Sequence, residues 1–140
     1  MSRDDKMRKN GFTLIELLIV LAVIAALISA MAPIGINAVK QAKATTVAMN
    51  LSSLSASAMS EFYLNHNTAV TLDDLKSYFT AKKSINDYGV KTTLGATVGY
   101  IHIWYKKSDV SASEVKHVLS SVVATDDGKP MVVIKVAKSW

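Results

Sequence analysis

The stretch GFTLIELLIV, residues 11–20, sets the architecture of this 140-residue chain. A charged segment gives way there to an apolar one, and from residue 12 to residue 36 Glu16 is the only ionisable side chain. About 20 apolar residues are enough for a helix to cross a bilayer, so residues 12–36 are predicted to span a membrane. A carboxylate inside such a helix is costly and marks a functional site by default. The alternative is that Glu16 lies near enough to the membrane surface to reach water.

The segment before it, residues 1–11, is a polar leader whose ionisable residues are Arg3, Asp4, Asp5, Lys6, Arg8 and Lys9. Positive charge before an apolar helix keeps the N-terminus in the cytoplasm. An ordinary secretory signal has an apolar core of about 7–15 residues that ends at a small-residue cleavage site. Residues 30–32 (AMA) imitate such a site, but the ring of Pro33 fits poorly into an extended scissile bond. An exported binding protein cleaved near Ala32 is therefore the less favoured interpretation.

Residues 11–20 resemble the prepilin signature of type IV pilins and the related pseudopilins, and the resemblance covers about residues 6–33. In that family a membrane aspartyl protease, the prepilin peptidase, cuts after the glycine and then methylates the new terminal amine. The resemblance implies that Gly11 precedes the cut and that Phe12 becomes an N-methylphenylalanine. It also implies that Glu16 is the glutamate used in filament assembly.

The resemblance implies a structural subunit of a type IV pilus-like filament, or fimbrium, that polymerises through its N-terminal helix. A pseudopilin of a type II secretion or competence (DNA-uptake) system is the alternative within the same family. The implied partners are further copies of the chain, prepilin peptidase, the inner-membrane assembly machinery and, before assembly, membrane lipid. The implied location is the inner membrane as a single-pass protein, then a surface filament or a periplasmic pseudopilus. Cell adhesion, twitching motility, secretion and DNA uptake all stay open, and neither enzymatic activity nor a cofactor is expected.

The chemistry of this motif follows from its residues. Gly11 has no Cβ and adopts any backbone shape easily, which suits a bond that a peptidase must approach. Glu16 comes one helical turn after Phe12, on the same face. Its carboxylate can therefore pair with the terminal amine of its own chain or of a neighbouring subunit. Because an unpaired carboxylate in an apolar environment costs several kcal/mol or becomes protonated, pairing between subunits would favour one axial register.

The predicted organisation has three parts: a leader (1–11) that is removed, a transmembrane and filament-core helix (12–36), and a globular domain (37–140) that includes the second half of the long helix. Pro33 and Gly35 disfavour regular helix near the end of the apolar run. One interpretation is a plain boundary between membrane helix and soluble domain. The other is a helix kink that lets subunits pack around a common core. About 100 soluble residues are enough for one domain with a modest core.

An apolar stripe at three- and four-residue spacing predicts the second half of the long helix: Val47, Leu51, Leu54, Ala58 and Phe62. The helix is expected to run from about Phe12 to Leu64. Residues 71–74 (TLDD) resemble a capping box, and the apolar residues Leu72, Leu75 and Phe79 fit a short second helix that begins there.

Residues 98–105 (VGYIHIWY) alternate along the chain and predict a strand, with residues 90–94 as its hairpin partner across Gly95. On this strand His102 is expected on a face of the sheet and Trp104 in the core.

Residues 111–114 (SASE) resemble another capping box, and apolar residues follow in helical register as far as Val122. Residues 126–130 (DDGKP) predict a turn and residues 131–137 a final strand. The predicted fold class is therefore α+β: a long N-terminal helix, apolar in its first half and amphipathic in its second, packed on a small antiparallel sheet of three strands with additional short helices.

Charge and cysteine content add weaker indications. The whole chain carries +5, and removal of the leader leaves about +3. Two interpretations of the scattered lysines stay open: an ordinary solvated surface, or contact with DNA through residues 82–83 and 106–107. There is no cysteine, unlike many type IV pilins, so the loop of residues 106–129 must be held by packing.

The sequence argues against an enzyme. His66, His102 and His117 lack the spacing of a metal site, and neither a cysteine nucleophile nor a glycine-rich phosphate loop is present. Residues 126–127 (DD) fit a turn better than a calcium site, because two carboxylates are few for that ion. Trp140 is expected to pack at the terminus.

Overall fold

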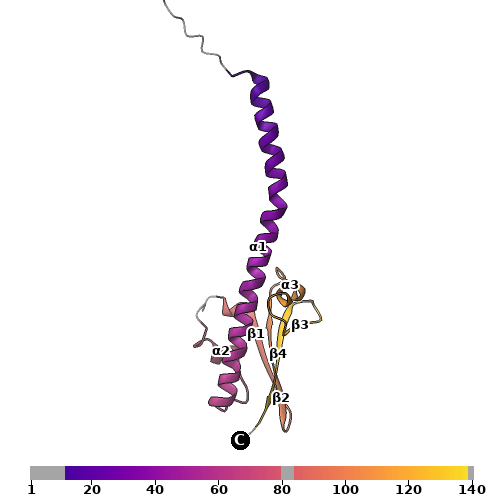
Figure 1. The fold of residues 1–140 in the computed structure, drawn as a ribbon. Helices are drawn as coiled ribbons and strands as arrows, with labels where there is room; N and C mark the ends of the chain where they lie inside the picture. The colour runs from indigo at the N-terminus through magenta and orange to yellow at the C-terminus, as the bar shows by residue number, and fades with distance from the viewer. Residues whose placement is uncertain (1–11, 80–83, 139–140) are drawn as a thin grey trace, which may run out of the picture. The chain divides into compact units, whose positions relative to one another are not determined.

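The computed structural model describes residues 12–79 and 84–138. Its elements, in chain order, are α1 (Leu14–Leu64), α2 (Leu72–Leu75), η1 (Ile85–Asp87), β1 (Tyr88–Leu94), β2 (Val98–Tyr105), α3 (Ala112–Lys116), β3 (Val122–Ala124) and β4 (Pro130–Ala137) (Figure 1). The strands form one antiparallel sheet in the order β1-β2-β4-β3. The predicted α+β class is confirmed. The described backbone divides into two compact units, with the boundary between Ala38 and Val39.

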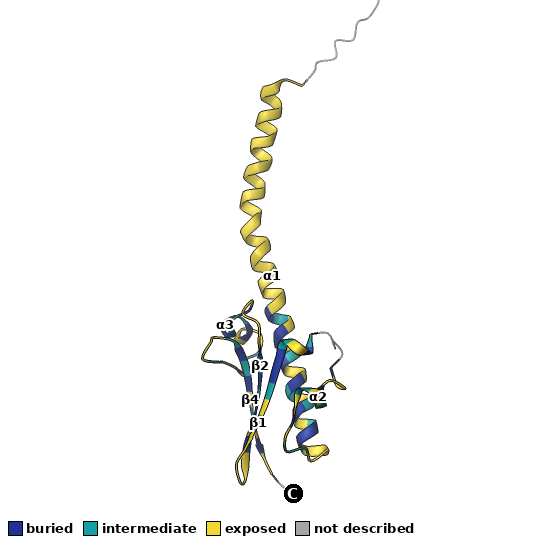
Figure 2. Cartoon of the chain, turned by 180° about the vertical axis from the view of Figure 1, so that it is seen from behind, coloured by how far each residue is buried: buried dark blue, intermediate teal, exposed yellow. Residues whose placement is uncertain are grey.

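In the first unit, α1 carries apolar side chains on all sides, and every described residue is exposed (Figure 2). The helix is continuous through Pro33 and Gly35, and it extends to Leu64 as predicted. The kink expected at this point stays a prediction. A helix that is apolar all round must be covered by lipid or by protein, because its own chain leaves it open to solvent.

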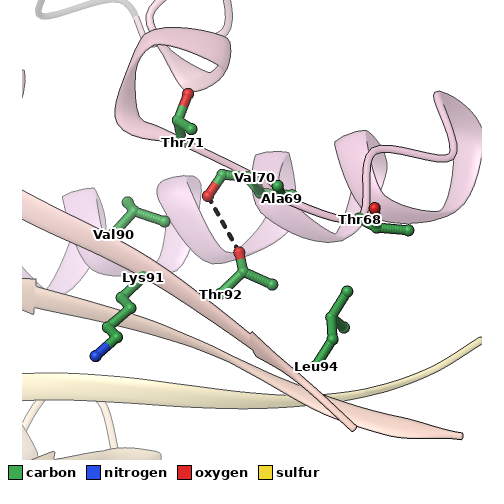
Figure 3. A pocket seen from close by; sticks show the side chains of 8 residues that line it. All are labelled: Thr68, Ala69, Val70, Thr71, Val90, Lys91, Thr92 and Leu94. Atoms are coloured by element: carbon green, nitrogen blue, oxygen red, sulfur yellow. Dashed lines mark hydrogen bonds between the residues drawn. The ribbon is translucent and has the colours of Figure 1, made fainter. Parts of the chain in front are cut away.

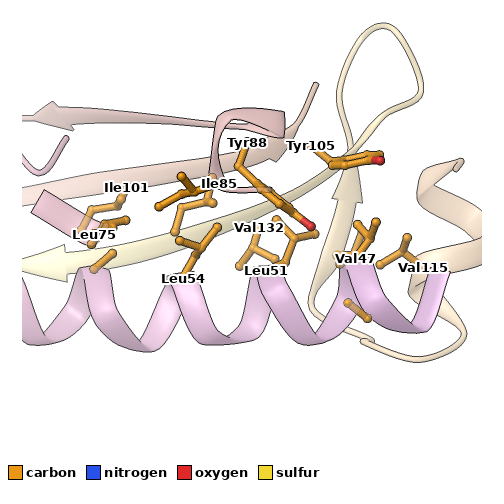
Figure 4. Close-up of a cluster of buried hydrophobic side chains, with 14 of the residues drawn as sticks. Val47, Leu51, Leu54, Leu75, Ile85, Tyr88, Ile101, Tyr105, Val115 and Val132 are labelled. Carbon is orange, nitrogen blue, oxygen red and sulfur yellow. The ribbon is translucent and has the colours of Figure 1, made fainter. Parts of the chain in front are cut away.

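In the second unit, α1 packs on the sheet through one stripe: Ala44, Val47, Ala48, Leu51, Leu54, Ala58 and Phe62. The three- and four-residue spacing puts these side chains on one face of the helix. Figure 4 shows Val47, Leu51 and Leu54 of this stripe on the side of α1 that faces the sheet. Ile101 and Val132 of the sheet and Val115 of α3 lie opposite them. The predicted stripe is therefore confirmed, and the core lies between α1 and one face of the sheet.

The sheet is built from two hairpins. β1 and β2 pair from Tyr88↔Tyr105 to Leu94↔Gly99, and β2 pairs along its length with β4. The turn predicted at residues 126–130 is confirmed, although it spans residues 125–129 because Pro130 already begins β4. Its Gly128 has φ 73°, where a side chain would be strained. This turn joins β3 to β4, and β3 reaches only the first three residues of β4. Further along, Ala137 donates its N–H to the Tyr63 hydroxyl (3.3 Å).

Two predictions about this region were wrong. The sheet has four strands, not three, because Val122 begins β3. The helix after Ser111 ends at Lys116, and single turns follow in which Val118 and Leu119 donate to the carbonyl of Val115. The apolar residues at 118–122 are spaced as in a helix, but the chain turns so that Val122 can enter the core from a strand.

Both predicted capping boxes are present. Asp74 accepts hydrogen bonds from the Thr71 N–H (2.9 Å) and hydroxyl (2.7 Å), and Glu114 accepts from the Ser111 N–H and hydroxyl (both 2.8 Å). The backbone bond, followed by the hydroxyl bond, holds the pKa of each carboxyl below its ordinary value. These boxes fix where α2 and α3 begin, although both helices are short.

Candidate functional site

The first turn of α1 is organised by Thr13 and Glu16. Glu16 Oε2 accepts hydrogen bonds from the Thr13 N–H (2.8 Å) and the Thr13 hydroxyl (2.8 Å). The Glu16 N–H points back to the Thr13 hydroxyl at 3.3 Å. This is a third capping box, and it opens the helix. The negative side chain lies beside the positive end of the helix dipole, which stabilises it there.

Within the box only one of the two carboxylate oxygens of Glu16 accepts hydrogen bonds. Its bonds to Thr13 all go through Oε2, and Oε1 has no hydrogen bond to any residue that the structure describes. Phe12, immediately before the box, is 84% exposed. A cut before Phe12 would leave the Thr13 amide intact, so the box is compatible with a chain that begins at Phe12. The free oxygen is then available to a cation from outside the helix.

Beyond this turn the helix surface is continuous and apolar. Large exposed side chains run from Leu14 to Val39, and the Ser29 hydroxyl is satisfied within the helix by the Ala25 carbonyl (2.8 Å). Small residues recur every fourth position at Ala22, Ala26 and Ala30, and such rows let helix backbones approach closely in membranes.

By length and composition, α1 is the one helix among the described residues that could cross a membrane. Signal sequences and the core helices of soluble proteins pass the same test, so the helix alone defines no function.

Two hollows that are lined by described residues lie within the second unit. One, of about 330 Å³, lies between β1 and the segment of residues 68–71 (Figure 3). The Thr92 hydroxyl donates to the Val70 carbonyl (3.1 Å) across it. Apart from Lys91, the side chains that line it are aliphatic or carry a hydroxyl group. The hollow therefore contains neither a nucleophile beside a general base nor a group of metal-binding side chains.

The other hollow, of about 370 Å³, lies between α1 and the start of β1. At its rim Asp109 accepts from the Tyr105 hydroxyl (2.9 Å) and pairs with Lys43 (3.2 Å). Burial, followed by the bond to Asp109, raises the pKa of Tyr105. Burial alone would raise the pKa of Asp109, but its bonds to Tyr105 and Lys43 bring that pKa below the ordinary value. The carboxylate thus ties the loop after β2 to α1.

The lysine pair at residues 106–107, a candidate for DNA contact, makes hydrogen bonds within the chain. Lys106 donates to the Asn86 carbonyl (3.1 Å), and Lys107 pairs with Asp87 (2.6 Å), which raises the pKa of Lys107. The charge of Lys107 is therefore balanced by an acid, whereas Lys106 is held by a backbone carbonyl. The other candidates, at residues 82–83, lie outside the described residues, as do Gly11, the leader and Trp140.

The remaining candidates fall on separate elements. His66, His102 and His117 lie after α1, on β2 and after α3. Asp127 at the β3–β4 turn is 3.8 Å from the Lys129 ammonium. Within residues 12–79 and 84–138, no group of three or more His, Cys, Asp or Glu side chains is placed to hold a metal. Trp104 was expected in the core, but it is half-buried on the opposite face of the sheet.

Comparison with protein families matches residues 6–32 to the prokaryotic N-terminal methylation motif, the signature of type IV pilins and pseudopilins. Comparisons with curated proteins and with solved structures give no match. The chain therefore carries a prepilin-type N-terminus, and its apolar helix fits insertion into a membrane. The motif implies processing by prepilin peptidase and assembly into pilus-like polymers, and it points to a class of structural proteins that are generally non-enzymatic.

Sequence reasoning singled out Glu16 but missed its partner. Thr13 was not named, although residues 13–16 (TLIE) fit the same capping-box pattern that was used for residues 71–74 and 111–114. This pattern is the signal in the sequence that identifies Thr13.

Proposed function

We propose that this protein is a structural subunit of a type IV pilus-like filament, cut between Gly11 and Phe12, methylated on Phe12, and polymerised through α1. The single observation that carries the proposal is the first half of α1, which is apolar on every side, fully exposed, and opened by one half-satisfied carboxylate. An apolar surface of this size needs a partner. Lipid supplies it before assembly, and further copies of the helix supply it afterwards.

Glu16 gives the assembly its register. In the core of a filament a carboxylate with one unbonded oxygen costs free energy, because water is excluded. The methylated amine of Phe12 on an adjacent helix is a cation of the right size and position to bind Oε1. Thr13 meanwhile keeps Oε2 satisfied within the chain and holds the carboxylate at the helix start. Adjacent helices avoid this free-energy cost only at the axial offset that brings the Phe12 amine of one helix to Glu16 of the next. The register is therefore set by this ion pair and not by aliphatic packing alone.

Three substitutions separate the charge of Glu16 from its role in the helix cap. Glu16→Gln keeps an oxygen that can accept from Thr13 but removes the charge. Glu16→Ala removes both, and Thr13→Ala removes the hydroxyl while it leaves the carboxylate in place. Filaments sheared from cells that express each variant would be measured by electron microscopy and by quantitative mass spectrometry.

We expect Glu16→Gln and Glu16→Ala to lower filament yield about ten-fold or more, since several kcal/mol of pairing are lost. Thr13→Ala should stay within about five-fold of the parent, because a helix cap contributes only about 1 kcal/mol. Membrane levels of each variant serve as the control for expression. Parental yield with Glu16→Gln would show that charge pairing is not used.

The same filaments give a second readout. The mature subunit is expected to begin at N-methylated Phe12, and material that begins at Pro33 would instead support an exported binding protein. A pseudopilin would have the same apolar N-terminal helix and the same processing. Long fibres outside the cell would favour the pilus, whereas short assemblies confined to the periplasm would favour the pseudopilus of a secretion or DNA-uptake system.

A further inference from the structure

The face of the sheet opposite α1 is not used by the core. Along each strand side chains alternate between the two faces, and the buried side chains, such as Ile101, Ile103 and Val132, all point to α1. The strand register then places one set on the outer face: Gly89, Lys91, Thr93, Val98, Tyr100, His102, Trp104, Val123, Met131, Val133, Lys135 and Ala137. The buried apolar residues of α1, α2 and α3 belong to the core on the other side.

Three aromatic side chains follow one another along the middle of this outer face. Tyr100, His102 and Trp104 occupy alternate positions of β2, about 7 Å apart along the strand. Tyr100 is 44% exposed, and its ring centroid is 6.4 Å from that of His102. Trp104 lies across β1, and a Cβ on Gly89 would collide with its indole ring. The glycine therefore lets the indole lie flat on the sheet.

The charges on this face are of one sign. Lys91 on β1 is paired in register with His102, and Lys135 on β4 is paired with Tyr100, so the two lysines flank the aromatic row from neighbouring strands. Both are exposed. The outward-facing positions of the four strands include no Asp, Glu, Asn or Gln. An anionic ligand with flat rings is therefore the complement of this surface.

We propose that the outer face of the sheet, centred on Tyr100, His102 and Trp104, binds single-stranded nucleic acid. Each ring can stack on one unpaired base, and Lys91 and Lys135 can contact the phosphates on either side. Stacking of two or three bases on aromatic side chains of a four-stranded sheet is an established mode of single-strand recognition. It tolerates any sequence because every base has a π-face.

Other occupants fit this face less well. A duplex hides its bases inside the stack and leaves the three rings without partners. A neutral sugar would need carboxylate or amide side chains to hold its hydroxyl groups, and the face has neither. A second copy of the same face would bring the positive charges of Lys91 and Lys135 close to the same lysines of the other copy, and this repulsion is unfavourable. The proposal does not depend on filament assembly, because each subunit carries the complete surface.

The test uses the full chain, dispersed in a neutral detergent, and fluorescence anisotropy with labelled dT12. Two matched probes separate the contributions: an abasic dodecamer keeps the phosphates without bases, and a dT12–dA12 duplex keeps the bases inside a stack. We expect dT12 to bind at least about ten-fold tighter than either, since one stacked base alone is worth that much. Equal affinity for the abasic strand or for the duplex, or no binding of dT12, would overturn the proposal.

Variants locate the site. Tyr100→Ala should weaken dT12 binding about ten-fold, and Tyr100→Phe, which keeps the ring, should restore it. Lys135→Ala should reduce the slope of log affinity against log salt by about 0.7, the contribution of one phosphate contact on a single strand. Lys116→Ala removes the same charge from α3, away from the face, and should leave that slope unchanged. Equal effects of the two lysine variants, or parental binding by Tyr100→Ala, would place the ligand elsewhere.

Discussion

Leu54 lies in the middle of the contact between α1 and the sheet, and its side chain is fully buried (Figure 4). Leu54→Ala should lower the free energy of unfolding by about 2–5 kcal/mol, because it removes apolar contacts and leaves a cavity. Met59 on the same helix is 44% exposed, so Met59→Ala is the matched control and should change stability far less. Urea unfolding of the full chain in neutral detergent, followed by circular dichroism, measures both. Equal losses would mean that the stripe is not the core.

Single residues were predictable where a local pattern determines their environment. The five residues of the stripe, Val47 to Phe62, are all buried as expected, because helix geometry alone puts them on one side. The position of Trp104 was not predictable in this way. Whether a strand residue faces the core depends on strands far away in sequence, and Gly89 makes room for its indole from the neighbouring strand.

At the scale of elements, α3 is too short to be stable as a helix on its own. It has only five residues, and the Ser111–Glu114 box supplies much of its local hydrogen bonding. Ser111→Ala should cost about 1 kcal/mol of stability, as for other N-cap losses. Ser120→Ala, in the exposed turn after α3, should cost little. Urea unfolding separates the two, and equal midpoints would show that packing of Val115 alone holds the helix.

Elements with a strong internal period were predictable, and short ones were not. α1 and β2 repeat their apolar positions over many residues, and both were predicted nearly to their ends. β3 has three residues, too few to show a period, and its apolar start at Val122 also fits the helical spacing from Val115. Only pairing with β4 identifies it as a strand. The capping box at Thr13 is the opposite case, because residues 13–16 (TLIE) alone predict it and no distant contact is needed.

The stability of the whole molecule should depend on pH in both directions. Asp74, Asp109 and Glu114 have lowered pKa values in the folded chain. As pH falls through their ordinary values, 3.8 and 4.5, the unfolded chain takes up protons first and is favoured. Tyr88 and Tyr105 have raised pKa values. Above their ordinary value of 10 the unfolded chain loses protons first, so stability falls as pH rises.

Urea midpoints between pH 3 and pH 11 measure this profile. Tyr105→Phe removes one titrating group together with its bond to Asp109. It should lower stability at pH 7 by about 1.5–3 kcal/mol, as for other hydrogen bonds to charged groups, and should flatten the alkaline fall. Glu114→Gln should flatten the acid fall and leave the alkaline one unchanged. A profile that is level from pH 5 down to pH 3 would contradict the assignment of the acid limb.

The short β3 has one more consequence for the molecule as a whole. Past Val132, the outer side of β4 has no strand partner among the described residues, and a bare strand edge is a template for unwanted aggregation. Two residues hinder pairing with another strand along this edge. The Tyr63 hydroxyl accepts the hydrogen bond of the Ala137 N–H, and the charge of Lys135 repels the same strand of another copy. Copies of the chain are thereby hindered from pairing along this edge of β4, so in the proposed filament the apolar half of α1 remains available as the surface of association.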